Sequence, residues 1–267
     1  MELWCEIRTP TTPSLKGIAS QIEALAPVAS GYLVPDNHLG RPTVSSLVVA
    51  QEVMRQGGEP LVCLNARDRN LLGFQRDLLT AGALGVERLL LVQGDPGGPA
   101  AGELRVRSML DEVRDRGGFK VGVTSRLGPL PAWKRDADCL FVQVGFSAAE
   151  LIRWRESVEF DGAVYAGVIV LASGPMARRL AAAAPEIHIP GPLIEAVDRD
   201  PWAGIEAACD LVDSMRAAGG FAGVHLVPGV RYRAIAAGLQ QLRNSPLSSL
   251  GQSHAPAGVR TQAEVDR

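Results

Sequence analysis

Short apolar runs alternate with longer amphipathic segments along almost the whole chain. Runs of this kind are typical of strands buried on both faces, and the segments between them carry apolar residues at helical spacing. We predict strands at residues 2–8, 31–35, 60–65, 88–93, 119–124, 139–144, 163–171 and 221–227. We predict helices at residues 42–58, 69–85, 101–118 and 201–220. Three of these helices end in a Gly-Gly pair, which suits a helix C-cap that leads into the next strand.

The segment 69–85 has the clearest helical pattern of the four. Its predicted apolar stripe consists of Leu71, Leu72, Gln75, Leu78, Leu79 and Leu84. Asp68 stands where an N-cap is expected, and Gly85 marks the predicted end of the helix. We therefore expect this leucine-rich face to pack against the sheet.

Strands that alternate with helices predict a parallel sheet covered by helices, which places the chain in the α/β class. The number of units and their length match a single-domain (β/α)8 TIM barrel over residues 1–243. A doubly wound open sheet is the alternative, but no GxGxxG motif follows the first strand. Residues 187–201 form a predicted excursion that covers one end of the barrel. Residues 244–267 are polar, with Ser, Pro and Gly, and are typical of a disordered C-terminal tail.

Composition and charge narrow the function classes. The chain has 267 residues, of which 46% are hydrophobic and 21% charged, and its net charge is -2. This balance gives no basic surface for nucleic acid, and no apolar run reaches the ~20 residues needed to span a bilayer. The four cysteines lie far apart without CxxC spacing, so neither a disulfide framework nor a metal site is predicted. The N-terminus lacks a signal-peptide pattern. We expect a cytoplasmic protein that acts on a small molecule, as a homo-oligomer or with a partner subunit.

Polar side chains stand where the predicted strands end. Glu6 interrupts the first apolar run, Asp95 follows the fourth in a Gly-Asp-Pro turn, and Gln143 interrupts the sixth. The carboxyl ends of the strands carry the active site of a barrel, so we expect these side chains to face one cavity. Glu6 suits a general acid, although an ion pair with Arg8 or another buried cation is the alternative, and Asp95 could instead be only a turn cap. His225 in the last strand suits a core histidine as well as a site residue.

Several segments together resemble the methylenetetrahydrofolate reductase family. They are CEIRTP (5–10), DN (36–37), NARDRNLLGFQRDLLTAGALGVERLLLVQGDP (65–96), FVQ (141–143), EIHIPGPLIEA (186–196) and GVHLVPGVRY (223–232). The RDRN helix that runs into a strand ending in GDP is the most specific part, and the resemblance covers nearly everything before the tail. It implies a (β/α)8 barrel in which a nicotinamide reduces FAD. The flavin then passes a hydride to 5,10-methylenetetrahydrofolate, which gives 5-methyltetrahydrofolate.

The resemblance also implies roles for individual residues. Glu6 matches the family's general acid, which would protonate the N10 side of the folate. Asp95 matches an aspartate near the flavin and the pterin, and Gln143 matches a glutamine that contacts the folate. The positions that match the cofactor site are Asn37, Cys63, Asn65, Gln93, Gly94 and Arg126.

The chain departs from the family pattern at the cofactor positions. Cys63 replaces a histidine and Asn65 a threonine, and residues 124–139 are shorter than the family's FAD-binding segment. Two versions of the reaction follow, one with bound FAD and one with hydride passed directly from NADH or NADPH. Two further hypotheses stay open. One is a non-catalytic folate- or flavin-binding subunit of a complex, and the other is a barrel repurposed for a non-folate substrate, with Cys63 as a thiolate.

Overall fold

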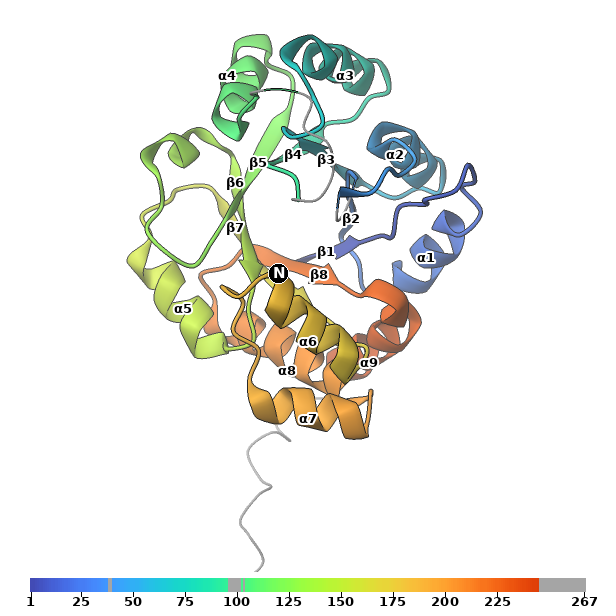
Figure 1. Cartoon of the computed structure of the whole chain (residues 1–267), viewed down its shortest axis with the longest axis vertical. Helices are drawn as coiled ribbons and strands as arrows, with labels where there is room; N and C mark the ends of the chain where they lie inside the picture. The colour runs from blue at the N-terminus through green and yellow to red at the C-terminus, as the bar shows by residue number, and fades with distance from the viewer. Residues whose placement is uncertain (38–39, 96–101, 103, 245–267) are drawn as a thin grey trace, which may run out of the picture.

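The apolar runs fold into the wall of a closed barrel (Figure 1). The computed structural model describes residues 1–37, 40–95, 102 and 104–244. Within these residues eight parallel strands follow one another in sequence order, and β8 pairs with β1 to close the ring. The predicted (β/α)8 barrel is therefore confirmed. The predicted tail lies outside the described residues from 245 onward.

The strands agree with the predicted runs to within a few residues at each end. They are β1 (Glu2–Glu6), β2 (Gly31–Val34), β3 (Pro60–Asn65), β4 (Arg88–Val92), β5 (Lys120–Ser125), β6 (Cys139–Val144), β7 (Ala163–Ile169) and β8 (Gly223–Val227). The helices are α1 (Ile18–Leu25), α2 (Ser46–Arg55), α3 (Leu71–Ala83), α4 (Val106–Arg116), α5 (Ala148–Ser157), α6 (Gly174–Ala183), α7 (Gly191–Arg199), α8 (Ala203–Ala218) and α9 (Tyr232–Asn244). Two 3-10 turns, η2 (Ala132–Asp136) and η3 (Gly229–Arg231), precede β6 and α9.

Side chains fill the interior of the barrel. Successive residues of a strand face opposite sides, so each strand sends alternate residues inward and packs the others under the helices. The inward cluster consists of Trp4, Leu33, Leu61, Cys63, Leu90, Phe141 and Tyr165. At the amino end of β1, Glu2 Oε2 accepts hydrogen bonds from Trp4 Nε1 (2.9 Å) and Tyr165 Oη (2.7 Å). This end is therefore plugged, and a ligand is directed to the mouth at the carboxyl ends of the strands.

The connection between β5 and β6 has no α-helix and contains only η2. The neighbouring helices hold this short connection in place. Arg114 Nε of α4 donates to the carbonyl of Asp136 (2.8 Å), and Trp154 Nε1 of α5 donates to the carbonyl of Gly128 (2.9 Å). Side chains of the two flanking helices thus anchor the connection, while β5 and β6 pair directly in the barrel wall.

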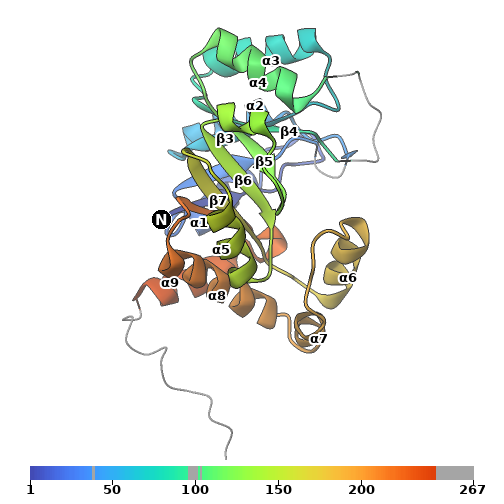
Figure 2. The same ribbon diagram turned by 90° about the vertical axis from the view of Figure 1, so that its left-hand side faces the viewer.

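Helices α6 and α7 stand apart from the ring, beyond the carboxyl ends of the strands (Figure 2). Ile189 and Val197 pack there in an apolar cluster with Leu171, and Val144 and Ile169 lie against it. The predicted excursion over residues 187–201 contains α7 and leads into α8, which runs along the barrel wall. This excursion therefore borders the mouth.

The predicted stripe of α3 is buried at Leu78, as predicted, but its other leucines within the helix are exposed. Leu72 and Leu79 are 74% and 62% exposed, and the buried residues of this helix are Phe74, Asp77, Leu78 and Ala81. The leucines offer two rival faces at helical spacing, and the one that contains the bulky Phe74 packs inward. The N-cap is Asn70, whose side chain accepts from the backbone N–H of Gly73 (2.8 Å), in place of the predicted Asp68.

Candidate functional site

Glu6 and His225 meet at the mouth, on the neighbouring strands β1 and β8. Trp4 points into the barrel and is paired in register with His225, so His225 and Glu6 point inward as well. Glu6 Oε2 lies 3.3 Å from His225 Nε2, and their side chains are 18% and 15% exposed, respectively. The distance suits a hydrogen bond but the angle does not, and Nε2 is buried without a hydrogen-bond partner in the described part of the chain. Arg8, one of the alternative ion-pair partners considered for Glu6, is exposed.

The wall beside Glu6 is apolar. Cys63 is buried, and burial raises the pKa of its thiol well above the ordinary value, with the negative charges of Glu6 and Asp36 raising it further. The thiol therefore stays protonated at neutral pH, which makes it a poor nucleophile. Phe141 presents its ring to His225 in an edge arrangement, with the centroids 5.9 Å apart. A reacting group held by Glu6 would thus face a wall that offers few polar contacts.

Asn65 ties the carboxyl ends of β2 and β3 together at the rim of the mouth. Its backbone N–H and its side-chain Nδ2 both donate to Asp36 Oδ2, at 3.0 and 2.8 Å. Nδ2 also donates to Asp68 Oδ2 (2.9 Å), and Oδ1 accepts from the Asp68 backbone N–H (2.9 Å). Asn37 Nδ2 donates to the same Asp68 oxygen (2.8 Å). Asn65 is 1% exposed, so both ends of its amide are already engaged by the protein.

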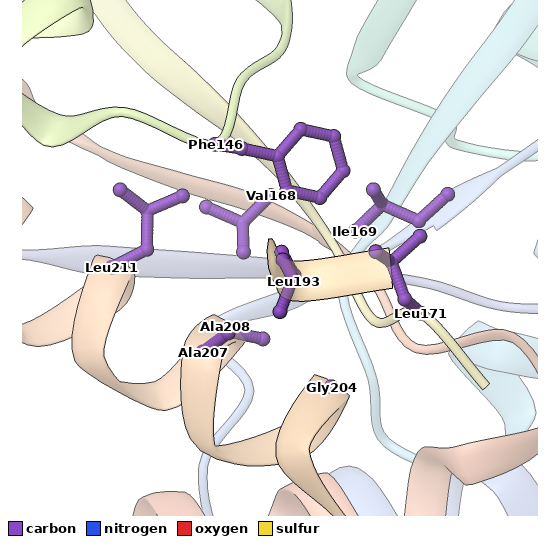
Figure 3. Close-up of a pocket in the computed structure, with 9 residues that line it drawn as sticks. All are labelled: Phe146, Val168, Ile169, Leu171, Leu193, Gly204, Ala207, Ala208 and Leu211. Atoms are coloured by element: carbon purple, nitrogen blue, oxygen red, sulfur yellow. The ribbon is translucent and has the colours of Figure 1, made fainter. Parts of the chain in front are cut away.

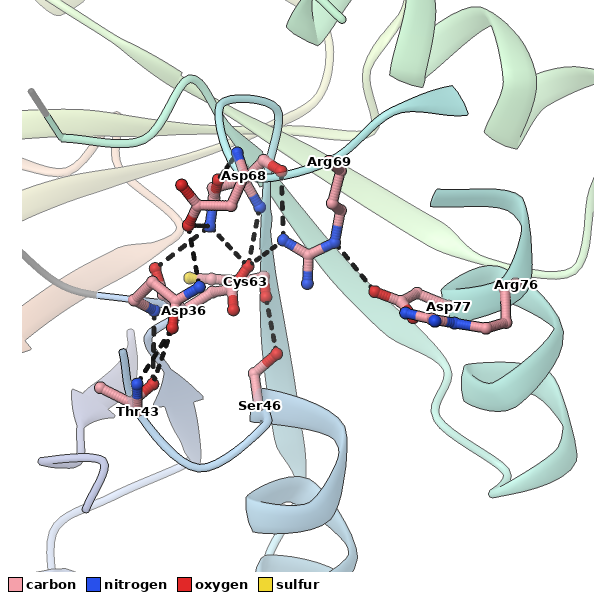
Figure 4. Close-up of polar contacts among 10 residues, drawn as sticks. Asp36, Thr43, Ser46, Cys63, Asp68, Arg69, Arg76 and Asp77 are labelled. Carbon is pink, nitrogen blue, oxygen red and sulfur yellow. Dashed lines mark hydrogen bonds and ion pairs between the residues drawn. The ribbon is translucent and has the colours of Figure 1, made fainter. Parts of the chain in front are cut away.

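Arg69 closes this network with two ion pairs (Figure 4). Its guanidinium contacts Asp36 through Nη1 and Asp77 through Nε, the latter at 2.9 Å. Burial lowers the pKa of Arg69, but the carboxylates of Asp36 and Asp77 outweigh that effect, so the net shift is upward. The cation is therefore fixed, and it neutralises carboxylates that would be costly to bury alone.

Gly94 shapes the turn that carries Asp95. Its φ of 87° is in the region that favours glycine. A Cβ at Gly94 would lie 3.0 Å from Arg67 Cβ and 3.1 Å from Asn65 Oδ1. The turn therefore packs directly on the network described above. The backbone carbonyl of Gln93 accepts a hydrogen bond from the Arg67 backbone N–H (3.1 Å), and the Gln93 side chain is exposed. Asp95 is half-buried just after β4.

Gln143 and Arg126 differ in how they stand at the mouth. Gln143 is half-buried at a β-bulge between Phe141 and Val144, and its Oε1 accepts from the Val144 backbone N–H (3.3 Å). No residue in the described part of the chain bonds its amide nitrogen, which is therefore available to a ligand. Arg126 has a side chain that is 81% exposed and lies 3.8 Å from a carboxylate oxygen of Glu186. It is a surface cation joined to the loop before α7.

The structure therefore brings some predicted residues together and separates others. Glu6 and Cys63 lie close enough for the negative charge of Glu6 to help raise the pKa of the buried Cys63 thiol. Asn37 and Asn65 belong to a polar network, and Arg126 lies on the surface. Sequence reasoning left the role of His225 undecided. Its inward direction could have been inferred from alternation along the last strand.

A separate small cavity lies between β7 and the helices α7 and α8 (Figure 3). Its volume is about 30 Å³, and its lining contains Phe146, Leu171, Leu193 and Leu211 together with other apolar side chains and one glycine. No polar side chain lines it, so it offers no group for acid–base chemistry. Across the described residues, no group of three or more His, Cys, Asp and Glu side chains is arranged to hold a metal ion. The described helices include none that is long and apolar enough to cross a membrane.

No family model matches this chain, and no curated sequence does. Among solved structures it is similar to N-(5'-phosphoribosyl)anthranilate isomerase from Pyrococcus furiosus, with 11% identity and a TM-score of 0.47 over 90% of this chain and 99% of that one. It is similar to tryptophan synthase from M. tuberculosis, with 14% identity and a TM-score of 0.45 over 80% and 92% of the two chains. It is also similar to DHDPS from Cyanidioschyzon merolae, with 12% identity and a TM-score of 0.45 over 90% and 96%. At these scores, none of the three bears on the activity of this chain.

Proposed function

We propose that this chain is an oxidoreductase similar to methylenetetrahydrofolate reductase, which reduces 5,10-methylenetetrahydrofolate to 5-methyltetrahydrofolate. The observation that carries the proposal is the partly buried carboxyl group of Glu6 at the mouth of the barrel, 18% exposed and within 3.3 Å of a histidine. Barrel enzymes place their catalytic residues at this end of the strands. The segment around Glu6 is also one of those that resemble the family.

In the proposed reaction Glu6 acts as a general acid. Its carboxyl proton passes to N10 of the substrate, the bond between N10 and the bridging carbon breaks, and an N5 iminium forms. A hydride from C4 of a reduced nicotinamide then adds to the iminium carbon, which gives the N5-methyl product and the oxidised nicotinamide. The apolar wall of Cys63 and Phe141 limits the access of water, which would otherwise hydrolyse the iminium. Asp95 and Gln143 supply hydrogen-bonding groups for the pterin.

Of the two versions we favour direct hydride transfer from NADH or NADPH. The amide of Asn65 is already engaged with Asp36 and Asp68, and Arg126 is a surface cation beside Glu186. The connection from β5 to β6 contains only a 3-10 turn. These residues do not fit a flavin site, so we assign no step to FAD.

Turnover by the purified chain tests the proposal. We expect loss of nicotinamide absorbance when methylenetetrahydrofolate is added with NADH or NADPH, formation of 5-methyltetrahydrofolate by chromatography, and no flavin bands in the visible spectrum. Glu6→Gln should lower turnover by about 10²-fold or more, the usual scale for loss of a general acid, with little change in ligand binding. Glu2→Gln is the matched control, because it makes the same change on the same strand at the plugged end. It should keep wild-type turnover.

Each other result points to a different conclusion. Flavin bands that are bleached by the nicotinamide would establish the flavin version instead. Folate binding without turnover, with and without added FAD, would favour a binding subunit that needs a partner enzyme. Neither binding nor turnover would refute the proposal and leave a non-folate substrate as the next hypothesis.

A further inference from the structure

We infer that His225 is a positioning residue for Glu6, and that its imidazole N–H stabilises the carboxylate that Glu6 becomes when it gives up its proton. The inference rests on the proposed function, because it gives His225 a part in the same proton transfer. The two side chains come from β1 and β8, the pair of strands that closes the barrel. Neither the resemblance nor the motifs assign His225 a role.

The geometry places His225 within reach of Glu6 but not yet bonded to it. The 3.3 Å between Nε2 and Oε2 is a distance at which rotation of the Glu6 carboxyl group completes a hydrogen bond. Nε2 is buried and has no other hydrogen-bond partner among the residues described. A buried polar atom without a partner is costly, so an interaction that forms during the reaction is favoured at this atom. Catalytic hydrogen bonds are often long in the absence of substrate and tighten in the transition state.

The surroundings of His225 direct it to Glu6. The Phe141 ring meets the imidazole in an edge arrangement with the centroids 5.9 Å apart, and Trp4 is the register partner of His225 on β1. The Phe141 ring therefore limits the rotation of the imidazole on one side. As the proton moves from Glu6 to the substrate, negative charge develops on Oε2. An N–H donor 3.3 Å from this atom, whose hydrogen bond is completed as the charge develops, stabilises the transition state more than the ground state, which raises kcat and leaves KM nearly unchanged.

Replacement of His225 tests the kinetic part of the inference. We expect His225→Leu to lower kcat by roughly 10- to 100-fold with KM within about twofold, the scale of a hydrogen bond to a charged group. His225→Gln can place an amide N–H near the position of Nε2 and should recover much of the loss. In a Glu6→Gln background, His225→Leu should cost little more, because the carboxylate that it serves is gone. His188→Gln, on an exposed histidine, is the matched control and should behave as the wild type.

A spectroscopic measurement separates this inference from the proposed function. In a 15N-edited NMR spectrum, the imidazole N–H resonance of His225 is assigned by its loss in His225→Gln. We expect this resonance to shift in Glu6→Gln and to stay unchanged in Glu2→Gln. If the wild type turns over no folate, the proposed function fails, while the NMR result still tests the pair. An active wild type with an equally active His225→Leu variant, or a resonance that ignores Glu6→Gln, would overturn the inference and leave the proposed function standing. Where His225→Leu does not fold, His225→Gln and the NMR comparison remain.

Discussion

Removal of the Arg69 guanidinium tests what stabilises the charged network at the carboxyl ends of β2 and β3. Arg69 is 14% exposed, and its partners Asp36 and Asp77 are 5% and 11% exposed. Arg69→Met keeps most of the length of the side chain but leaves Asp36 buried without its cation. Breaking a buried ion pair by removing one partner costs about 3–5 kcal/mol, because the remaining charge is neither solvated nor neutralised. We expect a loss of that size in the free energy of unfolding.

Arg76→Met is the matched control, because Arg76 contacts the same Asp77 from the outside. Its Nη2 lies 3.0 Å from Asp77 Oδ1, but its side chain is 75% exposed. An exposed ion pair contributes about 1 kcal/mol or less to stability, so the free energy of unfolding of Arg76→Met should be close to that of the wild type. Urea denaturation at neutral pH, followed by far-ultraviolet circular dichroism, measures both variants. The midpoint should fall strongly for Arg69→Met and little for Arg76→Met, with the slope against urea unchanged.

A second substitution shows whether the loss comes from the stranded charge. Asp36→Asn in the Arg69→Met background removes that charge and keeps an amide that can serve Asn65. Part of the lost stability should return, since a buried neutral group costs less than a buried carboxylate. Equal losses for Arg69→Met and Arg76→Met, or no recovery in the double variant, would refute the view that burial of Asp36 sets the cost.

Further predictions concern the turn, a thiol and a helix face. Gly94→Ala should destabilise the chain by about 1–3 kcal/mol, because its φ of 87° and a Cβ 3.0 Å from Arg67 Cβ both oppose a side chain; calorimetry that shows an unchanged Tm would contradict this. Burial raises the pKa of Cys5 from 9.0 to about 12, so its stabilising contribution is complete below pH 9 and is lost as pH rises toward 12. The free energy of unfolding, measured by urea denaturation at several pH values over this range, should therefore fall less steeply with pH for Cys5→Ala than for the wild type, by up to roughly 1 kcal/mol per pH unit. Parallel curves for the two proteins would contradict the raised pKa of Cys5. Leu78→Ala should cost about 2–5 kcal/mol and Leu72→Ala under about 1 kcal/mol, since the two leucines are 1% and 74% exposed; the reverse order in urea would mean that α3 packs on its other face.

The barrel was predictable because its strands carry a local signal. A strand covered on both faces must be apolar at nearly every position, and runs such as 60–65 and 139–144 coincide with β3 and β6. The buried face of α3 was not predictable in the same way. Two sets of apolar residues occur at helical spacing in that segment, and the choice between them depends on what the sheet presents to the helix.

In the candidate site, too, local sequence patterns place residues on elements but do not determine the contacts between elements. The positions of Glu6, Asp95 and Gln143 at strand ends follow from the order of the elements. The predicted barrel implies that β8 lies beside β1, but the 3.3 Å approach of His225 to Glu6 comes only from the structure. The engagement of Asn65 with Asp36 likewise depends on contacts between different strand ends, and no local pattern of residues encodes it.

The two glutamates of β1 mark its two ends, one at the closed base of the barrel and one at the open mouth. Glu2 joins Trp4 and Tyr165 at the closed base, while Glu6 stands at the mouth four positions later on the same inward side. Mutations that alter the chemistry can therefore accumulate around Glu6 without loosening the base on which the strand is anchored. Evolution or directed selection could exchange one reaction for another at the rim while the lower half of the barrel keeps the chain folded.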